Sequence, residues 1–173
     1  MNIIDYSKKF DAPISTLEKH TDFFPKNIFC IIAGSTGSGK TNLLVNLLLQ
    51  KDAINYSDLY VYSTTLHQPA YEYLKKCFET FEKLIYNKTH KTVKLAHFND
   101  KDSELVDPST LPKEQNHVMV FDDVMMEDQN MIKKYFCSGR HNNVNIFYLV
   151  QSLHKIAKHC IRENANIFIL FRQ

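Results

Sequence analysis

Short apolar runs recur along the chain, and between them apolar residues are spaced as on one face of a helix. Four of the runs are almost continuously apolar, as expected for strands covered on both faces of a parallel sheet. Runs of strand length that alternate with helical segments are typical of an α/β domain. The predicted strands are 28–33 (IFCIIA), 58–63 (DLYVYS), 92–98 (TVKLAHF), 117–122 (HVMVFD), 145–150 (NIFYLV) and 166–171 (NIFILF).

Helical spacing of apolar residues marks four further segments. Residues 40–50 are apolar on nearly every side, which predicts a buried helix, whereas residues 74–81 predict a helix with one buried face. Residues 131–136 predict a third helix, which Gly139 would end from the C-terminal capping position. Residues 153–160 predict a fourth helix before the last strand.

Glycine is scarce in this chain, with 4 residues in 173, and three of them lie close together: Gly34, Gly37 and Gly39. Glycine is needed where the backbone adopts a positive φ or closely approaches another group, so this segment is the first candidate for chemistry. It stands between a predicted strand and a predicted helix, which is the context that a phosphate loop requires. The phosphate-loop pattern GxxxxGK[ST] is matched by Gly34-Ser35-Thr36-Gly37-Ser38-Gly39-Lys40-Thr41.

This loop predicts a nucleotide site. Its consecutive backbone N–H groups would surround the β-phosphate, and the N-terminal end of the following helix adds a positive dipole. Lys40 would reach the β- and γ-phosphates, and the Thr41 hydroxyl would bind Mg²⁺. The alternative is a glycine-rich turn that only joins a strand to a helix, but such a turn needs neither the lysine nor the threonine.

Polar residues end two of the predicted strands. The apolar run 117–122 ends in Asp122, and Asp123 follows it directly, at the edge where α/β domains bind ligands. Asp122 is predicted to hold the Mg²⁺ shell, and Asp123, on the other side of the strand, to orient or deprotonate the attacking water. Gln151 ends the run 145–150 and is predicted to contact the γ-phosphate or its water. The alternatives are a solvated turn for the acid pair and a helix cap for Gln151.

The signatures of other phosphate-loop proteins are missing from the sequence. The guanine-binding pattern NKxD is approached only at residues 87–90, where histidine replaces the aspartate, and LSGGQ does not occur. The arginine-rich lid of a small kinase is not available, because the chain has only Arg140, Arg162 and Arg172. ATP hydrolysis coupled to mechanical work therefore remains. Arg140 is predicted to contact the γ-phosphate in a neighbouring subunit, with a surface arginine as the alternative.

Four segments together carry a family resemblance: GSTGSGKTNLLVNLL, VMVFDDVM, SGRHNNVNIFYLVQS and IRENANIFILF. They resemble the poxvirus-type genome-packaging ATPases of the FtsK/HerA superfamily, found in large double-stranded DNA viruses, virophages and related mobile elements. The likeness covers most of residues 28–171. Its most specific parts are the Asp-Asp pair and GRHNN, which leads into a strand that ends in Gln.

The resemblance implies a RecA-like (ASCE) P-loop NTPase fold, a three-layer α/β/α sandwich on a mainly parallel sheet of order 5-1-4-3-2. It further implies a homo-oligomeric ring that hydrolyses ATP with Mg²⁺ and pumps double-stranded DNA into a preformed capsid, with capsid or portal-vertex proteins as partners. Carried over by position, the nucleotide and Mg²⁺ are bound by Lys40 and Thr41, the Walker B acid is Asp122, the catalytic acid is Asp123, the sensor is Gln151, and the arginine acting in trans is Arg140.

Two other functions stay open at this point: a HerA- or FtsK-like translocase in repair, conjugation or segregation, and a nucleotide-binding assembly subunit that does not hydrolyse ATP. Two cationic groups could contact DNA phosphates without reading sequence, and solvated surface residues are the alternative for each. They are Lys83, Lys88, His90, Lys91 and Lys94, in a stretch without acids, and His154, Lys155, Lys158, His159 and Arg162, on the fourth predicted helix.

Composition narrows the class further. A chain of 173 residues suits one domain, which we expect to be an ATPase core at 28–173 after an N-terminal segment at 1–27. The net charge of +2 excludes a strongly basic DNA-coating protein. Neither a signal peptide nor an apolar run of about 18 residues is found, so we expect a protein of the host cytoplasm or virus factory, with virion association as the alternative. The four cysteines, without a CxxC pair, are expected to be buried and free.

Overall fold

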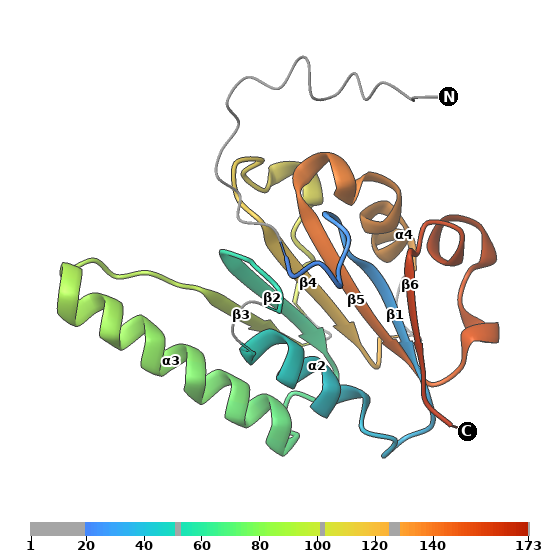
Figure 1. The fold of residues 1–173 in the computed structure, drawn as a ribbon, viewed down its shortest axis with the longest axis horizontal. Helices are drawn as coiled ribbons and strands as arrows, with labels where there is room; N and C mark the ends of the chain where they lie inside the picture. Colours follow the sequence, from blue (N-terminus) through green and yellow to red (C-terminus); the bar gives the residue numbers. More distant parts are fainter. Residues whose placement is uncertain (1–19, 51–52, 101–102, 125–128, 173) are drawn as a thin grey trace.

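One parallel sheet organises the protein (Figure 1). The computed structural model describes residues 20–50, 53–100, 103–124 and 129–172. Within these residues the sheet has six strands in the order β3-β2-β4-β5-β1-β6, and every neighbouring pair is parallel. The strands are β1 (Phe29–Ala33), β2 (Asp58–Ser63), β3 (Ala96–Asn99), β4 (His117–Asp122), β5 (Val144–Val150) and β6 (Ile167–Leu170).

Helices cover both faces of this sheet, as expected for parallel strands. In the described residues they are α2 (Lys40–Leu49), α3 (Pro69–Thr89) and α4 (Gln129–Ser138). α2 and α3 lie over one face and α4 over the other (Figure 1). Two apolar cores result, one including Leu44 and Leu74 under α2 and α3, the other including Phe136 and Ile161 under α4.

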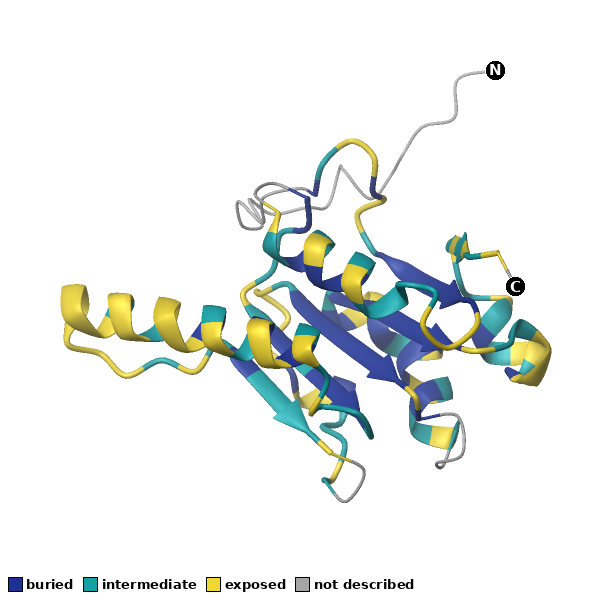
Figure 2. Ribbon diagram, turned by 90° about the horizontal axis from the view of Figure 1, so that it is seen from below, coloured by how far each residue is buried: buried dark blue, intermediate teal, exposed yellow. Residues whose placement is uncertain are grey.

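Burial follows from this layering. Every residue of β1, β4 and β5 is buried, whereas the C-terminal half of α3 is largely exposed and extends past the sheet (Figure 2). The side chains of Phe81, Leu84 and Tyr86 on that half are about half exposed, at 48%, 51% and 51%. The site-bearing strands therefore lie in the buried centre of the sheet, and α3 extends away from it.

The predicted α/β class is confirmed, and the strand order differs from 5-1-4-3-2 by one strand. Without β3, the observed order is β6-β1-β5-β4-β2. If these five strands are renumbered 1 to 5 along the chain, this is the expected order 5-1-4-3-2. β3 adds a further strand outside β2, because α3 leads the chain back to that edge. It is shorter than the predicted strand 92–98 and begins at Ala96, the first buried residue of that run.

Gly139 does not end α4 in the capping conformation that the sequence predicted. α4 ends at Ser138, Gly139 opens the 3-10 turn Gly139–Asn142, and the left-handed conformation belongs to Asn143, with φ 51°. A Cβ on Gly139 would lie 3.3 Å from Cζ of Phe29. The glycine is thus required for the close approach of this turn to β1.

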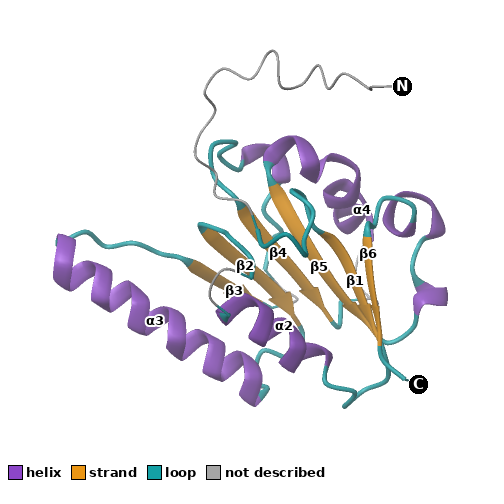
Figure 3. Ribbon diagram, in the orientation of Figure 1, coloured by secondary structure: helices purple, strands orange, loops and turns teal. Residues whose placement is uncertain are grey.

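The predicted fourth helix over 153–160 is wrong. Figure 3 shows only short helical segments between β5 and β6: the 3-10 turn Leu153–Lys155 and the π-type turn Lys158–Arg162. Cys160, with φ 72°, interrupts the second turn. The two buried anchors of the segment, Ile156 and Ile161, stand five residues apart, which does not place them on one helical face, and their packing overrides the local pattern.

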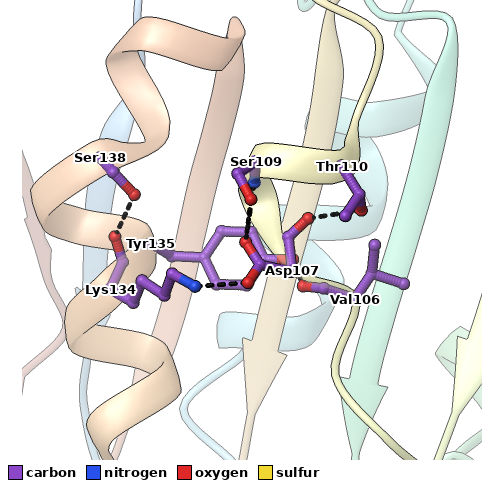
Figure 4. A network of polar contacts seen from close by, with 7 residues as sticks. All are labelled: Val106, Asp107, Ser109, Thr110, Lys134, Tyr135 and Ser138. Carbon is purple, nitrogen blue, oxygen red and sulfur yellow. Dashed lines mark hydrogen bonds and ion pairs between the residues drawn. The ribbon is translucent and has the colours of Figure 1, made fainter.

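A polar network fastens the loop before β4 to α4 (Figure 4). Nζ of Lys134 donates to Oδ2 of Asp107, and the Tyr135 hydroxyl donates to the carbonyl of Val106. Ser109 donates its N–H at 2.9 Å and its hydroxyl at 2.7 Å to Oδ1 of Asp107. The bond from Lys134 is the main cause that lowers the pKa of Asp107 to about 2, followed by the bonds from Ser109.

The first described residues pack against the sheet. His20 is buried, lies 3.2 Å from Oδ1 of Asn145 through Nε2, and accepts the N–H of Asn55 at Nδ1. Phe24 joins the core under α2 and α3. Residues 1–19 of the expected N-terminal segment lie outside the described residues.

The cysteines are free, as predicted, but only Cys30 is buried. Cys77 and Cys160 are partly exposed and Cys137 is exposed, because Cys77 and Cys137 lie off the buried faces of α3 and α4 and Cys160 lies in the π-type turn before β6. Among the described residues no cluster of His, Cys, Asp and Glu could hold a metal ion. No helix in the described part of the chain is long and apolar enough to cross a membrane.

Candidate nucleotide-binding site

The phosphate loop joins β1 to α2, as the sequence predicted. Gly37 and Gly39 have φ of 78° and 97°, conformations that side chains with a Cβ rarely adopt. Gly39 immediately precedes α2, so the backbone N–H groups at the start of this helix have no acceptor within the helix and face the loop. At the other end of the loop the N–H of Gly34 donates to the carbonyl of Val150, which ties the loop to β5.

Lys40 lies across its own loop. Its Nζ donates to the carbonyl oxygens of Gly34 at 2.8 Å and Ser35 at 2.9 Å. These bonds hold the ammonium group over the backbone that would surround a phosphate, and they are exchangeable for bonds to phosphate oxygens. The loop therefore has both the backbone curvature and the cation that a triphosphate requires.

Asp122 stands at the end of β4 and faces the phosphate loop. Its side chain is buried, and its Oδ2 accepts the Thr41 hydroxyl at 3.3 Å and the Tyr71 hydroxyl at 2.7 Å. Burial raises the pKa of Asp122, and the hydrogen bonds from Tyr71 and Thr41 oppose that shift. A hydroxyl and a carboxylate side by side are hard oxygen ligands of the kind that Mg²⁺ prefers.

Asp123 turns away from the strand into the left-handed conformation, with φ 56°. Its carboxylate receives two side chains from neighbouring strands: Gln151 Nε2 donates to Oδ1 at 3.3 Å, and Thr64 Oγ1 donates to Oδ2 at 3.3 Å. Thr64 also donates to the Asp123 carbonyl at 3.2 Å. The three residues form an exposed polar group beside the phosphate loop.

One cleft brings these predicted residues together. It is lined by parts of the phosphate loop, by Asp122 and Asp123, and by Gln151. The cleft lies at the C-terminal ends of β1, β4 and β5. This is the end of a parallel sheet at which ligands bind. The Gln151 side chain contacts Asp123 and does not cap the turn after β5.

The sequence did not predict Thr64, Thr65, Gln68 and Tyr71 as part of this region. Thr65 and Gln68 line the cleft, and Thr64 and Tyr71 bind the two aspartates. A signal for the threonines exists, because they follow β2 directly and β2 neighbours β4. Tyr71 gives no such signal, since it precedes the predicted helix 74–81 and does not follow a predicted strand directly.

Arg140 lies outside the cleft. It is exposed on the 3-10 turn before β5, its guanidinium is 5.2 Å from the ring centre of Phe29, and its Nη2 donates to the Asn164 carbonyl at 3.3 Å. Arg140 lies beside Phe29, which begins β1, whereas the cleft contains Gln151, which follows the end of β5. Because β1 and β5 are parallel, the arginine and the cleft are at opposite ends of the strands. Within one chain the structure does not bring Arg140 to the nucleotide site.

The two cationic groups lie on opposite sides of the sheet. The first follows the projecting half of α3 and the chain after it, with all five members exposed. In that group Lys94 contacts Glu82 at 3.6 Å. The second group lies on the two short turns after β5, and not on one helix as predicted; there His159 contacts Glu163 at 3.0 Å.

A phosphate loop after β1, an acid pair after β4, and β5 between these two strands define the class of the protein: it is a P-loop ATPase. Residues 19–171 match the family described as Poxvirus A32 protein, and the chain belongs to this family. The resemblance found in the sequence is thereby confirmed. No curated protein sequence matches this chain.

Solved structures share the fold. The genome packaging NTPase B204 from Sulfolobus turreted icosahedral virus 2 in complex with ATP-gammaS has a TM-score of 0.54 at 13% identity, over 87% of this chain and 76% of that chain. The same NTPase with AMP gives 0.54 at 12% identity, over 87% and 77%. The cytoplasmic domain of EssC gives 0.52 at 16% identity, over 84% of this chain but 31% of that one. Family and fold together support the predicted DNA-packaging ATPase.

Proposed function

We propose that this chain is an ATP-hydrolysing motor that moves double-stranded DNA during packaging of a viral genome. The observation that carries the proposal is the cleft in which the phosphate loop, Asp122, and Asp123 with Gln151 meet at one sheet edge. Family membership supports it. We further propose residues 28–173 as the ATPase core, 1–27 as an N-terminal segment, and the host cytoplasm or virus factory as the place of action.

ATP would bind with its β-phosphate in the loop 34–41. The N–H groups at the start of α2 donate to phosphate oxygens, and Lys40 exchanges its carbonyl partners for the β- and γ-phosphates. Thr41 and Asp122 fit a Mg²⁺ ion by their chemistry and would hold it. Bound there, Mg²⁺ would neutralise charge that develops on the phosphate oxygens.

Asp123 would act on the attacking water. Its carboxylate accepts a proton from the water as the oxygen attacks the γ-phosphorus, and the bond from phosphorus to the β–γ bridging oxygen breaks to give ADP and phosphate. Thr64 and Gln151 hold the two carboxylate oxygens from either side, which keeps Asp123 in place before the reaction.

Arg140 would serve the site of another subunit. A guanidinium suits the charge on a transferring γ-phosphoryl group, and this one is exposed at the edge opposite the cleft. Its action in trans requires a head-to-tail contact, and such contacts form an oligomeric ring when the rotation between subunits closes. DNA would run along the first cationic group, on the projecting half of α3 and the chain after it, because exposed cations that bind phosphates suit a motor that ignores sequence.

The test is ATP turnover by the purified protein with and without Mg²⁺ and double-stranded DNA, together with a mass measurement of the oligomer. We expect Mg²⁺-dependent hydrolysis that DNA stimulates. Lys40→Ala and Asp122→Ala should abolish it, whereas Lys113→Ala, an exposed lysine outside the cleft, should not change it. Tight ATP binding without turnover under assembly conditions would instead identify a non-hydrolysing assembly subunit.

A mixing experiment tests the trans role of Arg140. Arg140→Ala subunits keep an intact cleft, and Lys40→Ala subunits keep the arginine. If the arginine acts across subunits, a mixture of these two inactive proteins regains hydrolysis. A mixture as inactive as its components, under conditions in which mixed oligomers are detected, would refute the trans role.

A further inference from the structure

Tyr71 lies on the buried face of α3, and its hydroxyl contacts a residue of the nucleotide site. It lies in the first turn of α3, its side chain is fully buried, and its hydroxyl reaches the carboxylate of Asp122. The 2.7 Å bond to Oδ2 is much shorter than the 3.3 Å bond from Thr41 to the same oxygen. Tyr71 is thus the closer of these two donors to Asp122.

The tyrosine hydroxyl is not needed to fill the core. The ring of Tyr71 packs in the apolar core under α2 and α3 together with Leu74 and Phe78 of the same helix, and phenylalanine would fill the same space. A buried hydroxyl is unfavourable unless it finds a partner. Its partner here is the one carboxylate of the cleft that faces Thr41, so the hydroxyl acts on the site and not on the packing.

The hydrogen bonds of Thr41 and Tyr71 to Asp122 are compatible with a bound Mg²⁺ ion. The Thr41 hydroxyl can offer its oxygen to Mg²⁺ while its hydrogen stays on Asp122. Tyr71 approaches Asp122 from α3, whereas Thr41 belongs to the first turn of α2. Two donors from two different elements fix the direction in which a carboxylate points, whereas one donor leaves it free to turn.

We propose that Tyr71 is a positioning residue of the nucleotide site: its hydroxyl holds Asp122 in the orientation in which Asp122 and Thr41 bind Mg²⁺, and so ties the metal site to the first turn of α3. The proposal rests on the proposed function and goes beyond it. α3 is 21 residues long, about 30 Å at about 1.5 Å per residue, and its C-terminal half carries Lys83 and Lys88 of the first cationic group. A metal–nucleotide complex that stabilises Asp122 therefore also stabilises the root of the helix that we expect to contact DNA.

The first experiment compares Tyr71→Phe with wild type in binding of ATPγS, with Mg²⁺ and with EDTA. We expect the variant to need about tenfold more Mg²⁺ for half-maximal binding, since a hydrogen bond to a charged group is removed. Binding in EDTA should stay within twofold of wild type. Tyr56→Phe is the matched control, because it removes a tyrosine hydroxyl that donates to the Leu48 carbonyl at 2.8 Å, away from Asp122.

A merely structural role gives a different result: a lower Tm with an unchanged Mg²⁺ requirement, and that outcome would overturn the proposal. A cycle with Asp122→Asn adds a second criterion. If Tyr71 acts through Asp122, Tyr71→Phe causes no further change in the Mg²⁺ requirement in the Asp122→Asn background. An equal further loss there would also overturn the proposal.

Hydrogen exchange of the wild-type protein needs no variant to fold. The N–H groups of Tyr71 and Glu72 donate to the Gln68 carbonyl, both at 3.0 Å, and report on the first turn of α3. With saturating ATPγS, addition of Mg²⁺ should slow their exchange several-fold, and unchanged exchange would contradict the link. Both measurements use binding without turnover. A protein that shows the effect but hydrolyses no ATP would refute the motor and leave the inference standing.

Discussion

Removal of the Thr64 hydroxyl tests whether Asp123 depends on its neighbours. Thr64→Val keeps the shape of the side chain and deletes its bonds to Oδ2 and to the carbonyl of Asp123, at 3.3 Å and 3.2 Å. Bonds of this length at a partly exposed site contribute about 0.5–1 kcal/mol. At about 1.4 kcal/mol per tenfold change in rate, we expect kcat to fall about two- to fivefold. Thr64 does not belong to the phosphate loop, so KM for ATP should stay within twofold.

The assay is steady-state release of phosphate at saturating Mg²⁺ and DNA. Thr80→Val is the matched control, because it deletes a threonine hydroxyl that donates to the Lys76 carbonyl on α3, outside the cleft. Asp123→Asn should lose about 10²- to 10⁴-fold, as for a missing general base. In that background Thr64→Val should have no further effect on kcat. The same two- to fivefold loss in both backgrounds would show that Thr64 acts elsewhere and would refute the reasoning.

Three further predictions concern the scaffold and the surface. Asn145→Ala removes the acceptor of the Ile28 N–H, at 2.9 Å in a buried position, and should cost about 2–4 kcal/mol, seen as a Tm lower by about 5–12 °C. Lys88→Ala with Lys91→Ala should reduce the slope of log affinity for double-stranded DNA against log salt by about 2. Lys134→Ala should lower the urea midpoint equally at all pH values well above 4, and its effect should vanish as the pH falls through the pKa of Asp107 at about 2.

Controls separate each of these effects from a general loss of stability. Asn46→Ala, on the exposed side of α2, should leave the Tm within about 2 °C. Lys155→Ala with Lys158→Ala removes two charges from the second cationic group, and a larger change of the salt slope there would move the DNA path to the other side of the sheet. An effect of Lys134→Ala that persists unchanged to pH 2 would show that its charge does not act through Asp107.

The sign of the Asp107 prediction follows from its pKa. The carboxyl group has a lower pKa in the folded protein than in the unfolded chain, so folding favours the ionised form. Its contribution to stability is complete above the unfolded value of about 4 and is lost as the pH falls through the folded value of about 2. Between pH 5 and 8 stability should not change on this account.

Sequence pattern predicted the parts of this fold in which neighbours along the chain decide the structure. The phosphate loop is contiguous, and β4 and β5 are mostly apolar and buried at every position because both of their faces are covered. The pattern failed where contacts distant in sequence decide. Gly139 has the glycine of a helix cap, but its absent Cβ makes room for Phe29, which lies 110 positions earlier in the chain. The segment 153–160 has the spacing of a helix, but Ile156 and Ile161 pack into the core in another conformation.

The residues of the candidate site also differ in whether the sequence pattern alone predicts them. Asp122, Asp123 and Gln151 were found because polar residues that follow apolar strands meet at one edge of a parallel sheet. The same rule applied to β2 would have found Thr64, once β2 was known to neighbour β4. Tyr71 is different, because its apolar ring belongs to the buried face of α3 and only the packing of that helix over the end of β4 directs its hydroxyl to Asp122.

The direction of the strands decides what one subunit can do alone. β5 leads from the turn that carries Arg140 to the end that carries Gln151, and its seven residues at about 3.3 Å each separate the two by about 20 Å. A side chain cannot cross that distance without unfolding the sheet. The cleft of one subunit therefore has a lysine, an acid pair and a glutamine, but no arginine among the described residues that line it. If an arginine stabilises the γ-phosphoryl group, it must come from another subunit. The end of the sheet that carries Arg140 in one subunit must then face the cleft of the neighbouring subunit. Hydrolysis therefore depends on how the subunits are arranged.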